Sequence, residues 1–276
     1  MSHLELIKMT KRRELESGLK GESLVRKGLF EKIDVIPQVR IVPDLNVVKI
    51  GGHGIIDYGR EVVIPLVEEI GKLSENNKLL VVTGGGVRVR HIMDIGIELG
   101  MPTGVLAELA GKISEQNAIM MSILLSKYDG VRIHTDQLLQ ISSLLAIGLL
   151  PVIHGTPTYS LYEQPPMVGS IPPNRTDTGA VLIAEVLGAK NCIMLKNVDG
   201  LYTENPFVNT NAELIREITA EELLERDMED MVLERRAVEL LLSSKHIKEI
   251  KIANGHKPDA LTRTLNGENV GTVIRS

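Results

Sequence analysis

Hydrophobic and polar residues follow two different spacings along most of this chain. Short β-branched and aliphatic runs at 47–50 and 79–82 are typical of strands buried in a sheet. Apolar residues at helical spacing recur over 62–73, 92–99 and 104–127. Strands that alternate with helices in this order predict a mainly parallel sheet.

The second half of the chain continues the alternation. It predicts further strands at 150–154, 192–195, 248–253 and 270–274. A helix is expected from Asp177 to Leu187, with Thr176 or Asp177 as its N-cap residue. The proline-rich loop 155–173 is long, and such loops inside compact domains are usually functional or mobile. The simplest assembly is one large α/β domain, a three-layer αβα sandwich with helices on both faces of the sheet.

The beginning of the chain has a different pattern. Charged residues such as Lys11 and Arg12 interrupt its apolar runs, and Pro37 and Pro43 break its end. We therefore divide the chain into a charged N-terminal arm, residues 1–43, and one domain, residues 44–276. The arm is predicted to be helical and partly mobile, with a disordered tail as the alternative.

Composition and charge exclude several classes of protein. Hydrophobic residues make up 43% of the chain, which allows a large core and rules out disorder over most of its length. The formal net charge of −5 argues against a general nucleic-acid binder. The most apolar stretch, 144–153, is too short to span a membrane, and the charged start is unlike a signal peptide. The single cysteine, Cys192, fits a reducing compartment, so we expect a cytoplasmic protein.

Two glycine-rich turns follow predicted strands. They are Gly51-Gly52 and Gly84-Gly85-Gly86. Glycine lets backbone N–H groups approach an anion closely, and the start of a following helix adds partial positive charge, so together the turns suggest a phosphate cradle. Taken alone, each turn can be purely geometric. Neither matches the dinucleotide-binding or P-loop pattern, which disfavours a Rossmann dehydrogenase or a P-loop enzyme.

Three charged residues are placed near these turns by the predicted sheet. Lys49 belongs to a buried strand, where a solvated lysine would be out of place. It is a candidate phosphate clamp at the carboxyl end of the sheet, with an edge-strand lysine facing water as the alternative. Asp177 either caps its helix or orients lysines and holds Mg²⁺. Lys196, at the end of another strand, is the natural second cation.

These motifs, in this order, resemble the amino-acid kinase family, whose members include uridylate, acetylglutamate and isopentenyl phosphate kinases. The resemblance runs from about residue 45 to 275 and rests on segments 49–52, 84–86, 176–180 and 197–206. It implies an ATP-Mg²⁺ site, with phosphates at the two glycine turns and adenosine near 199–206. The implied catalytic residues are Lys49, Asp177 and Lys196. The implied nucleotide-binding residues are Gly51, Gly52, Gly84, Gly85, Gly86, Thr178, Asn197, Asp199, Gly200, Tyr202, Asn205 and Pro206.

Within that family, several segments are similar to those of molybdenum storage proteins. The segments are 48–52, 83–91, 115–117, 171–179, 254–255 and 267–275. The similarity implies an ATP-binding storage protein that holds molybdate or tungstate in a hexameric cage, with ATP hydrolysis driving loading. The cage would be a homo-oligomer or a hetero-oligomer with a homologous subunit. The alternative is a uridylate-type nucleoside monophosphate kinase or another small-molecule kinase of the family.

Two features depart from the family pattern. Many family kinases have a lysine directly before the Val-Asp-Gly triplet, where this chain has Asn197, with Lys196 one position earlier. Neighbouring residues of a strand point to opposite faces, so the face of Lys196 decides whether it reaches the same point. The loop after His154 also lacks the histidine run that one type of storage-protein subunit uses against its metal cluster.

Basic residues around the glycine turns suggest a site for an oxoanion or a second phosphate. The candidates are Arg88, Arg90, His91 and Arg175. Guanidinium groups can bind such oxygens in a forked geometry. The alternative pairs Arg88 or Arg90 with Glu98 or Asp94 on the same helix. We assign no metal ligands, although His134 and His154 lie near strand ends and could face an internal cavity.

Overall fold

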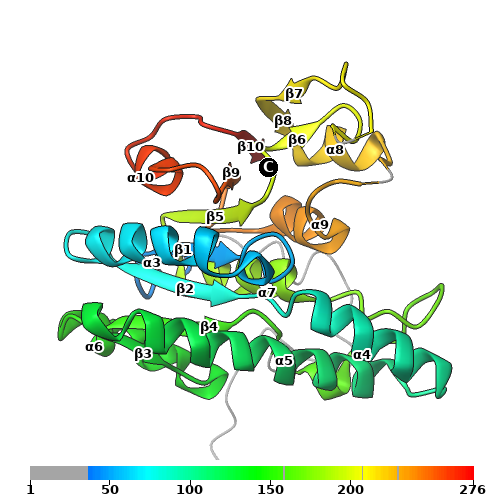
Figure 1. Cartoon of the computed structure of the whole chain (residues 1–276), viewed down its shortest axis with the longest axis horizontal. Coiled ribbons are helices and arrows are strands. Elements are labelled where there is room, and N and C mark those ends of the chain that lie inside the picture. The colour runs from blue at the N-terminus through cyan, green and yellow to red at the C-terminus, as the bar shows by residue number, and fades with distance from the viewer. Residues whose placement is uncertain (1–36, 158, 207, 229) are drawn as a thin grey trace, which may run out of the picture. The chain divides into compact units, whose positions relative to one another are not determined.

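An eight-stranded sheet lies at the centre of the computed structural model, which describes residues 37–276 apart from 158, 207 and 229. The strand order is β3-β4-β2-β1-β5-β9-β10-β8 (Figure 1). The strands are β1 (Asn46–Ile50), β2 (Leu79–Thr83), β3 (Gly130–Arg132), β4 (Leu150–His154), β5 (Asn191–Lys196), β8 (Glu217–Thr219), β9 (Glu249–Asn254) and β10 (Thr272–Arg275). All neighbours pair in parallel except β9 and β10, which are antiparallel. The predicted parallel character of the sheet is therefore confirmed, with one antiparallel pair.

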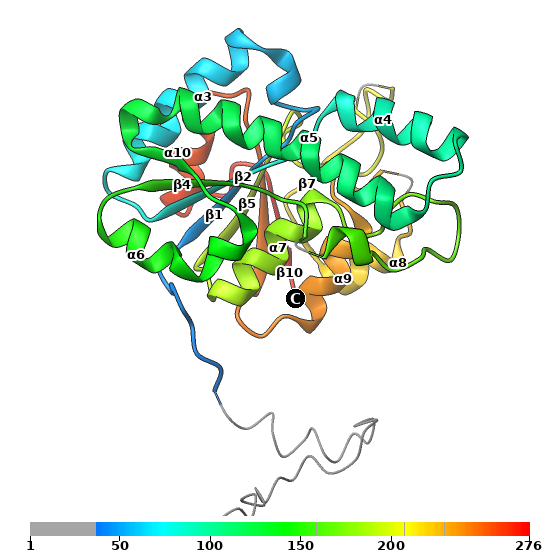
Figure 2. The same cartoon turned by 90° about the horizontal axis from the view of Figure 1, so that it is seen from below.

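Helices cover both faces of this sheet (Figure 2). One face carries α3 (Arg60–Ser74), α5 (Thr103–Leu124) and α10 (Ala260–Leu265), which share a core cluster with the strands. The other face carries α6 (Ile141–Ala146), α7 (Thr176–Leu187), α8 (Ala220–Glu225) and α9 (Arg235–Ser243), which form a second cluster. Helix α4 (Val87–Glu98) packs on α5. The three-layer αβα fold is confirmed.

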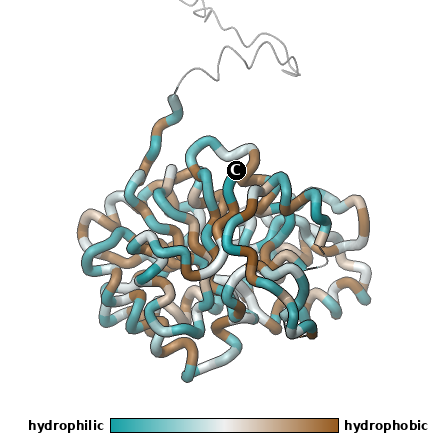
Figure 3. The backbone as a smooth tube through the Cα atoms, turned by 90° about the horizontal axis from the view of Figure 1, so that it is seen from above, coloured by the Kyte–Doolittle hydropathy of each residue, from teal (hydrophilic) through white to brown (hydrophobic). Residues whose placement is uncertain are grey.

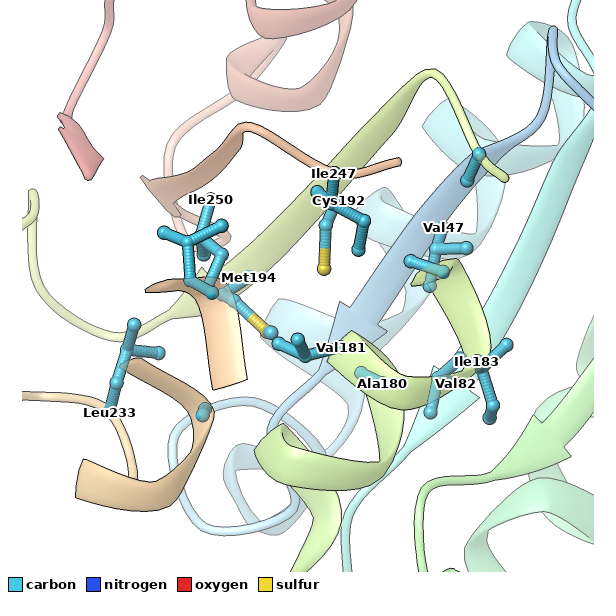
Figure 4. Packing of buried hydrophobic residues seen from close by; sticks show 14 of the residues in the cluster. Val47, Val82, Ala180, Val181, Ile183, Cys192, Met194, Leu233, Ile247 and Ile250 are labelled. Carbon is cyan, nitrogen blue, oxygen red and sulfur yellow. The ribbon is translucent and has the colours of Figure 1, made fainter. Parts of the chain in front are cut away.

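The strands of the sheet centre are apolar on both faces, as expected for a parallel sheet between two helix layers. Figure 3 shows hydrophobic stretches running through the middle of the domain and hydrophilic residues in many peripheral turns. In β1, Val47 belongs to the cluster on the α7 face, whereas Val48 belongs to the cluster on the α3 face. In β5, Met194 lies on the α7 face, and Figure 4 shows its side chain directed toward Val181 of α7. This alternation fixes which way every later residue of β1 and β5 points.

The described end of the arm is attached to the C-terminal end of α7. The side chain of Arg40 donates hydrogen bonds to the carbonyl oxygens of Gly188 and Ala189, each at 2.9 Å. The backbone N–H of Val42 donates to the carbonyl oxygen of Leu187 at 2.8 Å. Residues 1–36 of the predicted arm lie outside the described residues. No helix among the described residues is long and apolar enough to cross a membrane.

Candidate functional site

A cavity of about 510 Å³ lies at the carboxyl ends of β1, β2 and β5. Ligands of open α/β sheets bind at this edge. The predicted site residues that line it are Lys49, Gly51, Gly52, Gly84, Gly85, Gly86, Arg90, Arg175, Lys196, Asn197, Tyr202, Asn205 and Pro206. Segments that are far apart in the sequence therefore meet around one space of the size of a small-molecule pocket.

A buried ion-pair network forms one wall of the cavity. Lys49 Nζ lies 2.5 Å from Asp177 Oδ1, and Lys196 Nζ donates a hydrogen bond to Asp177 Oδ2 at 2.7 Å. The side chains of Lys49 and Asp177 are each only 5% exposed. Each carboxylate oxygen lies against one lysine amine, so Asp177 orients the two lysines, and each oxygen keeps a further lone pair for another partner.

The charges in this network alter the protonation equilibria of its members. Burial alone would raise the pKa of the Asp177 carboxyl, but the positive charges of Lys196 and Lys49 outweigh burial and hold the pKa far below its usual value. Burial lowers the pKa of Lys196, and the carboxylate of Asp177 opposes that change. The network therefore places two lysine amines and a carboxylate at the bottom of the cavity, where solvent screens their charges only weakly.

Lys196 reaches the same point as Lys49 because both face α7. Lys49 is two residues after Val47 in β1, and Lys196 is two residues after Met194 in β5, so all four side chains lie on the α7 face. The family pattern has its lysine one residue later, at the position of Asn197, and in this chain Lys196 is the lysine that contacts Asp177. Asn197 itself lines the cavity beside the first glycine turn, because its side chain is next to Gly54.

The two glycine turns touch each other at Gly52 and Gly86. A Cβ atom on Gly52 would lie 2.1 Å from the backbone nitrogen of Gly86. One on Gly84 would lie 3.1 Å from Thr176 Oγ1 and 3.4 Å from Lys49 Nζ. Close packing therefore requires glycine at position 52 and leaves little room at position 84, and the turns also expose backbone beside the lysines, where phosphate oxygens can approach.

The N-terminus of α7 is held by a residue that the sequence did not point to. The expectation that Thr176 or Asp177 caps this helix is wrong, because the N-cap position is Arg175 and no side chain from that position caps it. Instead, the carboxylate of Glu234 accepts hydrogen bonds from the backbone N–H groups of Asp177 and Thr178, at 3.0 and 2.9 Å, and from Thr178 Oγ1 at 2.7 Å. Glu234 directly precedes α9 and lines the cavity. No local spacing links it to α7, so only the tertiary fold reveals this role.

The basic residues of α4 separate into two groups. Arg88 donates to the side chains of Asn117 and Gln116 on α5, so the alternative pairing with Glu98 or Asp94 is wrong for Arg88. Arg90 lines the cavity, whereas Arg88 and His91 do not. Arg90 has no ion pair within the described part of the chain. Of the predicted anion-binding residues, Arg90 and Arg175 are therefore the two that lie at the cavity.

Three predicted nucleotide-binding residues do not line the cavity. Thr178 is buried beneath it and bonded to Glu234. The carboxylate of Asp199 accepts hydrogen bonds from Asn254, at 2.8 Å, and Lys257, at 2.7 Å. Gly200 packs against Thr272 of β10. Asp199 and Gly200 belong to the turn that leads from β5 to Tyr202, Asn205 and Pro206 at the cavity.

The histidines considered as cavity residues belong to a separate polar cluster. His134 lies 2.7 Å from Arg132 and 3.6 Å from Glu115 of α5, and His154 ends β4. Burial lowers the pKa of His154. In the described part of the chain, no group of three or more His, Cys, Asp or Glu side chains is arranged to hold a metal ion.

The αβα fold and the lysine-lined cavity beside two glycine turns point to one family of α/β proteins. The chain belongs to the amino acid kinase family, whose model matches residues 44–255. It is 41% identical over 261 residues to the molybdenum storage protein subunit beta of Azotobacter vinelandii (strain DJ / ATCC BAA-1303), which covers 95% of this chain and 97% of that relative. It is 30% identical to the uridylate kinase of Thermofilum pendens (strain DSM 2475 / Hrk 5), covering 84% of this chain and 98% of the kinase.

Solved structures agree with this fold. The UMP kinase from Ureaplasma parvum superposes with a TM-score of 0.66 and covers 84% of this chain and 99% of its own. The uridylate kinase from Archaeoglobus fulgidus superposes with a TM-score of 0.64. The identities are 22% and 23%, so these neighbours establish the architecture alone.

Proposed function

We propose that this protein is an ATP-binding storage protein of the molybdenum-storage type. In this proposal it holds molybdate or tungstate inside an oligomeric cage, and ATP hydrolysis drives the loading of the oxoanion. The observation that carries the proposal is the convergence of Lys49, Asp177 and Lys196 with two glycine turns around one cavity. The 41% identity to a molybdenum storage subunit over nearly the full length of both chains supports storage over other functions of the family.

The residues of the cavity suit the triphosphate of a nucleotide. Lys49 and Lys196 would meet the charge that develops on the γ-phosphoryl group, and Asp177 keeps both amines aimed at one point. Backbone N–H groups of the glycine turns would contact phosphate oxygens. Tyr202, Asn205 and Pro206 would form the adenosine side, and Arg90 and Arg175 would bind the oxoanion or a second phosphate.

Mg²⁺ fits this site chiefly as a partner of the phosphates. The described residues offer no cluster of three ligands, and the two oxygens of Asp177 are held by lysines. When bound, Mg²⁺ supplies charge neutralisation to the phosphate oxygens, and it commonly takes most of its ligands from phosphate and water. The chain's own contribution is the pair of lysine amines that Asp177 holds at the cavity.

The proposed working form is a hexamer in the cytoplasm. It contains either copies of this chain alone or this chain with a homologous subunit. Each subunit supplies one nucleotide cavity, and the cage encloses the oxoanion cargo. A native mass measurement in the presence of ATP tests the stoichiometry.

A loading assay tests the storage function. The purified protein is incubated with ATP, Mg²⁺ and molybdate or tungstate, desalted, and assayed for metal by mass spectrometry. Retention that depends on ATP and is lost in Lys49→Ala is expected. Lys78→Ala, which removes an exposed lysine paired with Asp44 on the surface, should load normally. Retention of fewer than one metal atom per subunit in the complete mixture would sink the storage proposal.

The second candidate is a uridylate-type nucleoside monophosphate kinase. The uridylate kinase of Thermofilum pendens is 30% identical to this chain, and that similarity favours this candidate among the small-molecule kinases. A coupled assay of ADP release separates this kinase from the storage protein. The acceptors tested are UMP, other nucleotides, glutamate derivatives and isopentenyl phosphate. ADP release that requires an acceptor supports the kinase. ATP binding without any turnover would instead indicate a catalytically silent ATP sensor.

A further inference from the structure

A carboxylate of the chain itself lies at the N-terminus of α4, where the sequence predicts an anion. Asp57 belongs to the short 3-10 turn Ile56–Tyr58, directly after the first glycine turn. Its Oδ2 atom accepts a hydrogen bond from the backbone N–H of Val87, the first residue of α4, at 2.6 Å. Its own backbone N–H donates to the carbonyl oxygen of Gly52 at 2.9 Å. Asp57 therefore joins the first glycine turn to the helix that follows the second.

The contact with the second glycine turn is equally close. A Cβ atom on Gly86 would lie 2.5 and 2.7 Å from the two carboxylate oxygens of Asp57, so only glycine leaves room for the carboxylate. Gly86 has a φ angle of +77°, a conformation that glycine adopts without strain. Gly86 lines the cavity, whereas Asp57 is not part of the lining. The carboxylate of Asp57 thus lies behind Gly86, and Gly86 forms the part of the cavity wall that a bound anion would contact.

Without Asp57, the N-terminus of α4 would present partial positive charge at this side of the cavity. A helix N-terminus carries roughly half a positive charge, which favours a nearby anion. The negative charge of the Asp57 carboxylate, which accepts the first N–H group of α4, cancels the attraction of this helix end for a ligand anion. The side chain of Asp57 is 20% exposed, so water screens its charge incompletely. Among the described residues, the ionisable side chain within 4.0 Å of this carboxylate is His53, whose Nδ1 lies 4.0 Å from Asp57 Oδ2 and whose side chain is 55% exposed.

A similar arrangement is found at α7, which also begins at the cavity. Glu234 accepts the first N–H groups of α7, as described above. Both helix starts are therefore held by acidic side chains of the chain itself. The positive charge available to a ligand comes from side chains, chiefly Lys49, Lys196 and Arg90.

We propose that Asp57 is a specificity-determining residue, which lowers the affinity of the cavity for phosphate or oxoanion groups by cancelling the positive end of α4. The ligand class is a small tetrahedral or phosphate-bearing anion, either free or as part of a nucleotide. The inference deepens the proposed function but rests only on the presence of an anion site beside Gly84–Gly86. Its consequence is weak, reversible binding of anions, with a penalty that increases with the charge of the ligand.

The test compares the full-length protein with Asp57→Asn by isothermal titration calorimetry. Asparagine keeps an oxygen that can accept the Val87 N–H, so the turn keeps its hydrogen bond while the charge is removed. The ligands are orthophosphate, molybdate, UMP and uridine. Asp57→Asn should bind each anion about threefold to tenfold more tightly than the wild type and uridine equally, because the change acts through charge. The matched control is Glu61→Gln, which removes an exposed carboxylate four residues away, in the first turn of α3.

Each outcome decides the proposal. A gain for orthophosphate and molybdate identifies a free-anion site, whereas a gain for UMP alone identifies a nucleotide phosphate. An equal or weaker affinity in Asp57→Asn for every anion, a gain that Glu61→Gln matches, or no measurable anion binding by either protein overturns it. ATP titrated into the same samples reports separately on the proposed function. Loss of ATP binding in all samples would contradict that function while leaving the anion comparison intact.

Discussion

Two lysine amines and one carboxylate account for most of the chemistry of the site. Two like charges held near one point repel each other, and in a buried position water does little to weaken that repulsion. Asp177 separates Lys49 from Lys196 and contacts both. Two amines and the Asp177 carboxylate meet in the network, and the Glu234 carboxylate also acts on Lys196. Amines that line the cavity beside two glycine turns are the physical reason to expect an anionic group such as a phosphate at this point.

Replacing Lys49 with alanine tests whether this lysine contacts the anionic ligand. The change removes one charge-assisted contact to the ligand, so ATP should bind more weakly by about 1–3 kcal/mol. Isothermal titration calorimetry measures the affinity directly. Lys78→Ala removes an exposed lysine paired with Asp44 and should bind ATP as the wild type does. An unchanged affinity in Lys49→Ala would remove Lys49 from the site.

The elements that carry local signals could be predicted from the sequence, and those held by distant contacts could not. The apolar runs of β1 and β2 and the helical spacing of α3 and α5 gave the correct element types, because burial on a sheet or along a helix stripe imposes its own period. The edge strands β3 and β8 are three residues each, too short for a period to stand out. The capping of α7 by Glu234, 57 residues away, has no local signal at all.

The start of α7 offers a test at the scale of the element. In Glu234→Gln, one of the two backbone N–H groups loses its acceptor, because the amide nitrogen cannot accept a hydrogen bond. Glu234 is 9% exposed, so water replaces the lost bond poorly, and the free energy of unfolding should fall by about 1–3 kcal/mol. Urea denaturation measures this change. Glu222→Gln, an exposed glutamate of α8 paired with Arg226, should change it by less than about 1 kcal/mol, and an equal loss in both variants would contradict the capping role.

At the scale of the whole molecule, the sheet brings together what the sequence keeps apart. β1 lies between β2 and β5, so the turns after β1 and β2 adjoin, and the lysines of β1 and β5 point to the same helix layer. The parallel arrangement places all three carboxyl ends at one edge. The family resemblance predicted this convergence. The roles of Asp57 and Glu234 depend on contacts between elements, which the order of motifs along the chain does not specify.

The stability of the fold should depend on pH through Asp177. Its pKa is lower in the folded protein than the ordinary value of 3.8, because Lys196 and Lys49 outweigh the effect of burial. The stabilisation by the carboxylate is therefore complete above the unfolded-state pKa and is lost as the pH falls through the lower, folded-state pKa. Asp177→Asn removes a partner of a buried pair and should lower the free energy of unfolding by about 3–5 kcal/mol at pH 7.

The pH dependence of that difference separates the ion pair from simple packing. Urea denaturation of both proteins between about pH 3 and pH 7 should give a constant difference at the upper end that shrinks below about pH 4, where the unfolded wild-type chain takes up a proton. Asp94→Asn, which neutralises an exposed carboxylate on α4, should leave the free energy of unfolding nearly unchanged at pH 7. A difference for Asp177→Asn that stays constant to pH 3 would show that shape, and not charge, is what the two lysines require at this position.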